Sequence, residues 1–143
     1  MSSGNRSFVP LLIAQTCAAL LVLVVVLSWP GEWNKQRWAG AMIAIPAVIL
    51  LLSARFELGR SFSISPQARK LVTRGLYSKI RNPMYVFSTL MVVGFLLTVE
   101  NPYLFIILAV LVPTQIIRAH KEAKVLEEKF GDEYREYRSR TWF

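Results

Sequence analysis

The sequence predicts an all-α integral membrane protein with about four transmembrane helices. The chain has 143 residues, and 54% of them are hydrophobic. Asp, Glu, Lys and Arg are absent from four long segments, residues 7–31, 38–54, 82–99 and 101–117. Each segment has about the 17 to 25 residues with which a helix crosses a hydrocarbon core of about 30 Å. Soluble folds of this size rarely separate their charge so completely, so a soluble Rossmann enzyme, a disordered chain and a disulfide scaffold are excluded.

The four helices are expected over residues 9–29, 38–53, 83–99 and 102–117. The first apolar run is longer than the roughly 7 to 15 apolar residues of a signal peptide, so we expect it to persist as an anchor. Asn82-Pro83 and Asn101-Pro102 each place a capping side chain before a proline, and each pair predicts a helix start. The third and fourth helices should therefore form a tight hairpin.

Positive charge predicts the orientation in the membrane. Residues 54–82 carry Lys and Arg in excess, with Glu57 as the one acid, and residues 118–143 are also rich in Lys and Arg. Such segments stay in the cytoplasm, so an even number of spans places both termini there, in a cell inner membrane or an endoplasmic-reticulum-like membrane. Three aromatic residues would mark the opposite interface: Trp29, Trp33 and Trp38.

The same two cytoplasmic segments are where chemistry is expected. Long ordered loops and tails are usually functional, so we divide the chain into an anchor, residues 1–53, and a core, residues 54–143. Because His120 is the single histidine, neither a His-based metal site nor a Ser-His-Asp arrangement is expected.

The tail predicts a helix over residues 118–129, a stop at Gly131 and a short helical turn over residues 132–138. Arg118 and Glu122 are four residues apart and lie on one side of that helix. The spacing alone fits a surface ion pair of a few tenths of a kcal/mol, and it also fits a functional pair.

Two stretches carry a family resemblance. One is residues 71–85, with the sequence LVTRGLYSKIRNPMY; the other starts with Arg118 and Glu122 and continues with Leu126, Phe130-Gly131, Glu133-Tyr134 and Tyr137. Together they resemble the membrane-embedded isoprenylcysteine carboxyl methyltransferase family, which is related to the phospholipid methyltransferases. The similarity covers roughly residues 58–143.

The resemblance implies methyl transfer from S-adenosyl-L-methionine to a lipophilic or lipid-anchored substrate, similar to an isoprenylcysteine carboxylate, at the cytoplasmic membrane face. It implies a cytoplasmic cofactor-binding loop before the third helix and a C-terminal helix that completes the cofactor site. Arg118 falls on an arginine associated with substrate and catalysis. The positions that match the cofactor site are Arg69, Lys70, Leu71, Val72, Tyr77, Asn82, Pro83, Met84, Tyr85 and Glu122.

Two positions depart from the family's pattern. The family commonly has histidine where this chain has Asn82, and a second glutamate where it has Ala123. Asparagine still donates and accepts hydrogen bonds, so the first change preserves that capacity. The second change leaves one carboxylate for the cofactor.

Methyl transfer from a sulfonium suits these residues. The reaction needs a nucleophile held in line and a pocket that excludes water, rather than a metal. The rings of Tyr77 and Tyr85 can attract the sulfonium, although without the motif both would be taken for interfacial aromatics. Glu122 would accept hydrogen bonds from the cofactor, and Arg118 would orient an anionic substrate.

Other functions remain as alternatives at this stage. A net charge of +8 suits nucleic acid, but no nucleic-acid motif accompanies it, so we expect no such partner. A non-enzymatic adaptor would bind anionic lipid or a partner through the basic loop and tail. A small transporter would rely on few polar residues within the spans: Gln15, Thr16, Thr89, Thr98 and Gln115. The residues leave the acceptor atom open among oxygen, nitrogen and sulfur.

Overall fold

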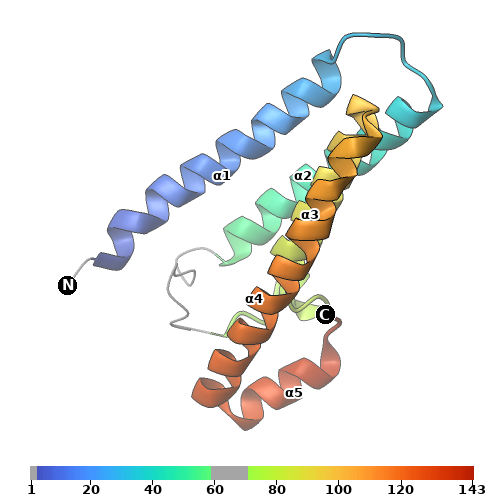
Figure 1. Cartoon of the computed structure of the whole chain (residues 1–143). Helices are drawn as coiled ribbons and strands as arrows, with labels where there is room; N and C mark the ends of the chain where they lie inside the picture. Colours follow the sequence, from blue (N-terminus) through green and yellow to red (C-terminus); the bar gives the residue numbers. More distant parts are fainter. Residues whose placement is uncertain (1–2, 59–70) are drawn as a thin grey trace.

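The computed structural model describes residues 3–58 and 71–143, with side chains from residue 13 onward. The described elements are, in order, α1 (Ser3–Ser28), α2 (Lys35–Leu58), the 3-10 turn η2 (Gly75–Ser78), α3 (Pro83–Val99), the 3-10 turn η3 (Pro102–Phe105), α4 (Ile106–Phe130) and α5 (Asp132–Arg140). Figure 1 shows α2, α3 and α4 running side by side while α1 leans away from them towards its N-terminus. Helix α5 begins at the lower end of α4 and turns away from it towards the C-terminus (Figure 1).

The helices agree with the predicted segments but differ from most of them in extent. Helix α1 starts at Ser3 instead of residue 9, and α4 starts at Ile106, after the 3-10 turn η3, instead of at residue 102. Helix α3 has the predicted bounds, whereas α2 is longer than predicted at both ends. Helix α4 continues without a break through the tail to Phe130, because the polar residues after its apolar part are strong helix formers. Gly131, with φ of +51°, ends α4 as predicted, and the short turn expected after it is a nine-residue helix, α5.

One of the two predicted asparagine caps is present. The Asn101 side chain accepts a hydrogen bond from the Tyr103 N–H. Asn82-Pro83 does mark the start of α3, as predicted, but the expected side-chain cap is wrong, because the Asn82 side chain makes no capping bond and its backbone has φ of −125° and ψ of 60°. Its backbone N–H instead donates to the Phe143 carbonyl, 2.8 Å away.

Helices α2 and α3 make the most extensive contact between helices. Their backbones touch at Gly40 and Gly94. A Cβ atom built on Gly40 would lie 2.6 Å from Thr98 Oγ1 and 2.7 Å from the Gly94 carbonyl oxygen. A Cβ on Gly94 would lie 2.5 Å from the Ala44 backbone nitrogen. Small residues four apart thus let the two helices approach until only glycine fits between them.

Hydrogen bonds from a buried arginine fix the connection between α1 and α2. Arg37 is buried at the start of α2, and its guanidinium donates to the carbonyls of Pro30 and Gly31. The Asn34 side chain donates to the Glu100 carboxylate just beyond α3. These bonds tie the upper ends of α1, α2 and α3 together.

Two helical segments are long and apolar enough to cross a membrane, Lys35–Leu58 and Pro102–Phe130. Two shorter apolar helices accompany them, Ile13–Ser28 and Pro83–Val99. Only 6% of the apolar window of Pro102–Phe130 is buried, against 39% of that of Lys35–Leu58. An exposed apolar face of this extent indicates contact with lipid rather than with water.

The contact between α2 and α3 generates a stability prediction. Gly40→Ala should lower the free energy of unfolding by about 1 to 3 kcal/mol, because the new methyl group overlaps Thr98 and Gly94. In an open helix the same change would stabilise by up to about 1 kcal/mol, so the expected sign is opposite to the propensity effect. Thermal unfolding in detergent, followed by circular dichroism, is the measurement. Ala39→Leu, at the exposed neighbouring position, is the control and should change the midpoint little.

Candidate active site

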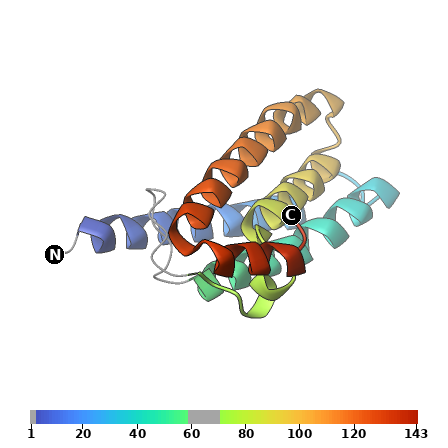
Figure 2. The same ribbon diagram turned by 90° about the horizontal axis from the view of Figure 1, so that it is seen from below.

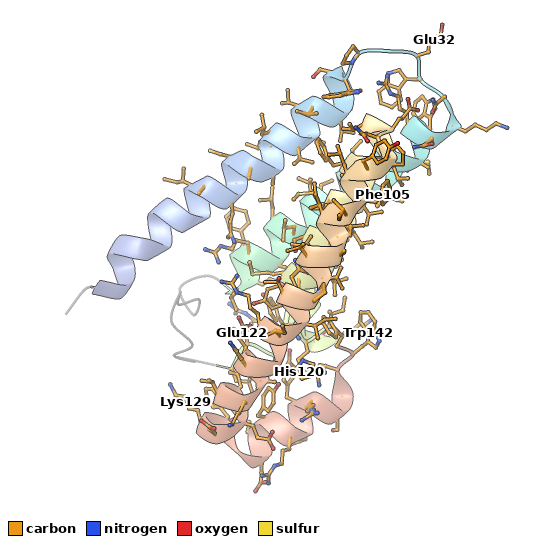
Figure 3. The ribbon with its side chains drawn as sticks, viewed as in Figure 1. Glu32, Phe105, His120, Glu122, Lys129 and Trp142 are labelled. Atoms are coloured by element: carbon orange, nitrogen blue, oxygen red, sulfur yellow. The ribbon has the colours of Figure 1, made fainter. Side chains whose placement is uncertain are left out.

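A hydrogen bond between Tyr85 and Glu122 joins the start of α3 to the polar half of α4. The Tyr85 hydroxyl donates to Glu122 Oε1 over 2.6 Å. Tyr85 lies in the first turn of α3, and Glu122 lies beyond the apolar part of α4, which ends at Ile117. Figure 3 shows Glu122 in the lower half of α4, far from Phe105 at its upper end.

The Glu122 carboxyl is half-buried, and its surroundings act on its ionisation in two directions. Burial raises the pKa of Glu122, while the hydrogen bond from Tyr85 and the positive charge of Arg118 oppose that rise. Arg118 itself is exposed. Glu122 therefore has a hydrogen-bond partner on α3 as well as the nearby positive charge of Arg118 on α4. An isolated surface ion pair with Arg118 does not account for this arrangement.

Ser88 and Thr89 on α3 and Gln115 on α4 form a polar ladder, a set of hydrogen bonds that links the two helices above this bond. The Thr89 hydroxyl donates to Gln115 Oε1 over 2.6 Å, and Gln115 Nε2 donates to the Ser88 hydroxyl over 2.9 Å. Ser88 in turn donates to the Tyr85 carbonyl oxygen. Both ends of the Gln115 amide are thus bonded to α3, two helical turns before Glu122. The ladder fixes how α4 is rotated against α3, and so where Glu122 points.

The segment before α3 is held by the end of α2. The Leu76 N–H donates to Glu57 Oε2 over 2.8 Å. Gly75 has φ of +61°, and a Cβ there would lie 2.0 Å from Glu57 Oε1, so glycine is required both by conformation and by space. Tyr77 packs beside this anchor in a cluster with Ala54 and Phe87.

The tail closes over the same segment from the other side. The Tyr137 hydroxyl on α5 donates to the Tyr77 carbonyl oxygen over 2.7 Å. The Trp142 N–H donates to the Lys79 carbonyl, and the Arg81 N–H donates to the Trp142 carbonyl, each over 2.8 Å. Figure 2 shows α5 lying across the lower ends of the bundle, with the end of the chain beside the start of α3.

Not all of the predicted site residues are brought together. Tyr85 and Glu122 meet directly, and Asn82, Pro83 and Met84 precede Tyr85 at the start of α3. Pro83 and Tyr77 are buried, whereas Met84 is half-buried in the cluster around Tyr77. Leu71 and Val72 are half-buried at the beginning of this segment. Arg69 and Lys70 lie outside the described residues.

Several residues that hold the site were missed from the sequence. Glu57 is the one acid in the strongly basic sequence of residues 54–82, and that isolation is the available sign that it has a structural role. For Thr89 and Gln115 the available signal is that they are polar residues within apolar helices. The contact of Tyr137 with a backbone carbonyl has no local sequence signal, because its partner is 60 positions away.

Comparison with known proteins gives this geometry a context. A model of the phospholipid methyltransferase family matches residues 35–133, which include α2, α3, α4 and both Tyr85 and Glu122. The chain belongs to the phospholipid methyltransferase family. As a member of that family it is a methyltransferase, and the family predicted from the sequence is confirmed.

A curated relative of this phospholipid methyltransferase family member comes from Arabidopsis thaliana and is named protein-S-isoprenylcysteine O-methyltransferase B. The two are 31% identical over 139 residues, which cover 90% of this chain and 70% of the relative. No solved structure matches this methyltransferase significantly.

The buried Tyr137 hydroxyl generates a prediction for alkaline stability. Burial raises the pKa of Tyr137 to about 12, whereas an exposed tyrosine has a pKa of about 10. The unfolded chain therefore loses its proton first, so stability from this group is complete below pH of about 10 and is lost as the pH rises towards about 12. In Tyr137→Phe this loss should be absent, and the unfolding midpoint should fall less steeply over that range.

At neutral pH, Tyr137→Phe should also lower the free energy of unfolding by about 1 to 2 kcal/mol, because it leaves the buried Tyr77 carbonyl oxygen without its donor. Thermal unfolding at a series of pH values measures both effects. Tyr103→Phe, at an exposed tyrosine, is the control. Identical pH profiles for Tyr137→Phe and the parent chain would contradict the assignment.

Proposed function

We propose that this chain is an integral-membrane methyltransferase that uses S-adenosyl-L-methionine and acts on a lipophilic substrate similar to an isoprenylcysteine carboxylate, at the cytoplasmic face. The observation that carries the proposal is the Tyr85–Glu122 hydrogen bond, which joins the two family motifs at one point in space. It lies where the apolar part of α4 ends, so a substrate held in lipid and a cofactor from the cytoplasm can meet there.

The residues around this bond fit S-adenosyl-L-methionine. The bound cofactor would supply a methyl group activated on a sulfonium. Glu122 offers a half-buried carboxylate that can accept hydrogen bonds from an amine or from ribose hydroxyls. Tyr85 offers an aromatic face, and the start of α3 at Asn82, Pro83 and Met84 offers the positive end of a helix dipole. Arg69, Lys70, Leu71, Val72 and Tyr77 are proposed to complete the site.

Arg118 favours a carboxylate acceptor. Its guanidinium is exposed one residue after the apolar run and one turn before Glu122. A carboxylate can lie in the planar fork of arginine with two parallel hydrogen bonds, and it is already ionised at neutral pH, so it needs no general base. The ammonium of an aminophospholipid would be repelled by Arg118 and would have to lose a proton before it could attack. The name of the Arabidopsis relative agrees with a carboxylate acceptor, whereas the family name makes the phospholipid amine the second candidate.

The proposed topology has four spans, α1, α2, α3 and the apolar part of α4. Lys and Arg in residues 54–82 and in the tail support a cytoplasmic location for both segments, and hence for both termini. The division into an anchor, residues 1–53, and a methyltransferase core, residues 54–143, stays a prediction. The adaptor alternative is not favoured, because the family is one of enzymes.

The first functional prediction concerns Glu122. Glu122→Gln keeps the shape of the side chain and an acceptor for the Tyr85 hydroxyl but removes the charge. It should weaken binding of S-adenosyl-L-methionine by about 1.5 to 3 kcal/mol, the range for a hydrogen bond to a charged group. Calorimetry on protein in nanodiscs is the measurement, with Glu128→Gln on the exposed face of α4 as the control. Equal losses in the two variants would remove Glu122 from the proposed site.

The second functional prediction separates chemistry from binding at Arg118. Arg118→Lys keeps the charge but loses the planar fork, so turnover of an S-prenylated cysteine should fall about ten-fold or more, equivalent to about 1.4 kcal/mol of barrier. Cofactor affinity should change by less than about three-fold, because Glu122 and Tyr85 are intact. The assay is transfer of labelled methyl groups in nanodiscs at saturating cofactor.

Arg140→Lys is the matched control, since Arg140 is an exposed arginine in a surface ion pair with Glu136. Near-parental turnover of Arg118→Lys would return Arg118 to the role of a membrane-interface cation. A parallel assay with phosphatidylethanolamine tests the acceptor. Methylation of that lipid and not of the S-prenylated cysteine would overturn the carboxylate proposal while leaving the Glu122 prediction standing.

A further inference from the structure

The backbone of Trp142 is fixed beside the residues that precede α3. Two hydrogen bonds of 2.8 Å join it to the Lys79 carbonyl and to the Arg81 N–H, and it forms an isolated parallel bridge with Ile80. Ile80 lies three residues before Pro83, where the apolar helix α3 begins. Trp142 therefore sits at the depth at which the chain passes from the aqueous loop into the apolar helix.

The Trp142 side chain points outwards although its backbone is held. It is 66% exposed, and its ring lies 5.9 Å from the ring of Phe143. Lys79, which accepts the Trp142 N–H through its carbonyl, is also exposed. An exposed amphipathic ring whose backbone is bonded to that of an exposed lysine suits the headgroup region of a bilayer, where the ring contacts acyl chains, the indole N–H finds polar partners and the cation meets phosphate.

The other end of the bundle carries a matching set of exposed tryptophans. Trp29, Trp33 and Trp38 all lie near the α1–α2 connection, and Trp38 is 57% exposed. Between the two sets lies α3, whose 17 residues span about 26 Å at 1.5 Å per residue. That length is close to the hydrocarbon thickness of about 30 Å. Figure 3 shows Trp142 at the level of Glu122, with Glu32 at the opposite end.

We propose that Trp142 is a membrane anchor that occupies the headgroup region of the cytoplasmic leaflet and holds residues 79–82 at that depth. The bonds to Lys79 and Arg81 transmit this position to the start of α3, and thus to Tyr85. The occupant of this surface is the bilayer that the chain itself spans. The inference goes beyond methyl transfer and rests on the membrane part of the proposed function.

Fluorescence from single tryptophans tests the proposal. In one variant Trp29, Trp33 and Trp38 are replaced by phenylalanine, so that Trp142 alone emits; in the matched control Trp29, Trp33 and Trp142 are replaced and Trp38 remains. Both are reconstituted into vesicles of phosphatidylcholine and phosphatidylglycerol that contain lipid brominated either near the glycerol or deep in the acyl chain. We expect Trp142 to be quenched at least about two-fold more strongly by shallow than by deep bromine, as for an interfacial ring.

The control separates this inference from the proposed membrane topology. Lipid quenching of Trp38 without quenching of Trp142 overturns the anchor and leaves the spanning helices in place. Loss of lipid quenching in both variants overturns the membrane topology as well. Stronger quenching of Trp142 by deep bromine also overturns the anchor, because the ring would then lie within the hydrocarbon.

A second measurement covers the case in which the triple replacements do not fold. A Cys17→Ser, Trp142→Cys chain is labelled with an environment-sensitive fluorophore at position 142. We expect its emission to shift to shorter wavelength on reconstitution and to be quenched by the shallow brominated lipid. Emission at the wavelength of the free dye in water, unaffected by brominated lipid, overturns the proposal.

Discussion

The contact between the backbones of Gly40 and Gly94 is the constraint on which the rest of the molecule depends. It sets the distance and rotation of α3 against α2. The start of α3 carries Tyr85, and the end of α2 carries Glu57, so the same contact positions the two residues that respectively bond α4 and the segment before α3. A methyl group between these helices would therefore displace parts of the site that lie far from either glycine.

Beyond that contact, the site is assembled mainly by hydrogen bonds between elements. In lipid, apolar side chains gain little by meeting one another, so close packing and polar bonds decide how helices associate. Helix α4 buries little of its apolar surface and is bonded to α3 through Gln115 and Glu122. The turn η2 is likewise held by bonds from α2 and α5, and the residues between η2 and α3 are held by backbone bonds from the tail. Because buried hydrogen bonds are strengthened by a low dielectric, few are needed to fix this geometry.

The sequence predicted those features whose physical cause is local. Uncharged segments marked the helices, the proline after Asn82 marked the start of α3, and Gly131 marked the end of α4. The fourth span and the tail helix are predicted as separate segments because apolar residues give way to charged ones at Arg118, but no breaker or cap lies there and the structure has one helix. The motif residues Tyr85 and Glu122 were identified by resemblance, but their direct bond was not. The hydrogen bonds of Trp142 to Lys79 and Arg81 use only backbone atoms, so no pattern of side chains in the sequence predicts them.

Because α4 is unbroken, it fixes the distance between Arg118 and Glu122. Arg118 and Glu122 are carried on one rigid helix, four residues and therefore about 6 Å apart along its axis. A group held at Arg118 and a group held at Glu122 are then spaced by helix pitch rather than by the closure of a loop. An insertion of one residue between Arg118 and Glu122 would turn Glu122 by about 100° away from Tyr85.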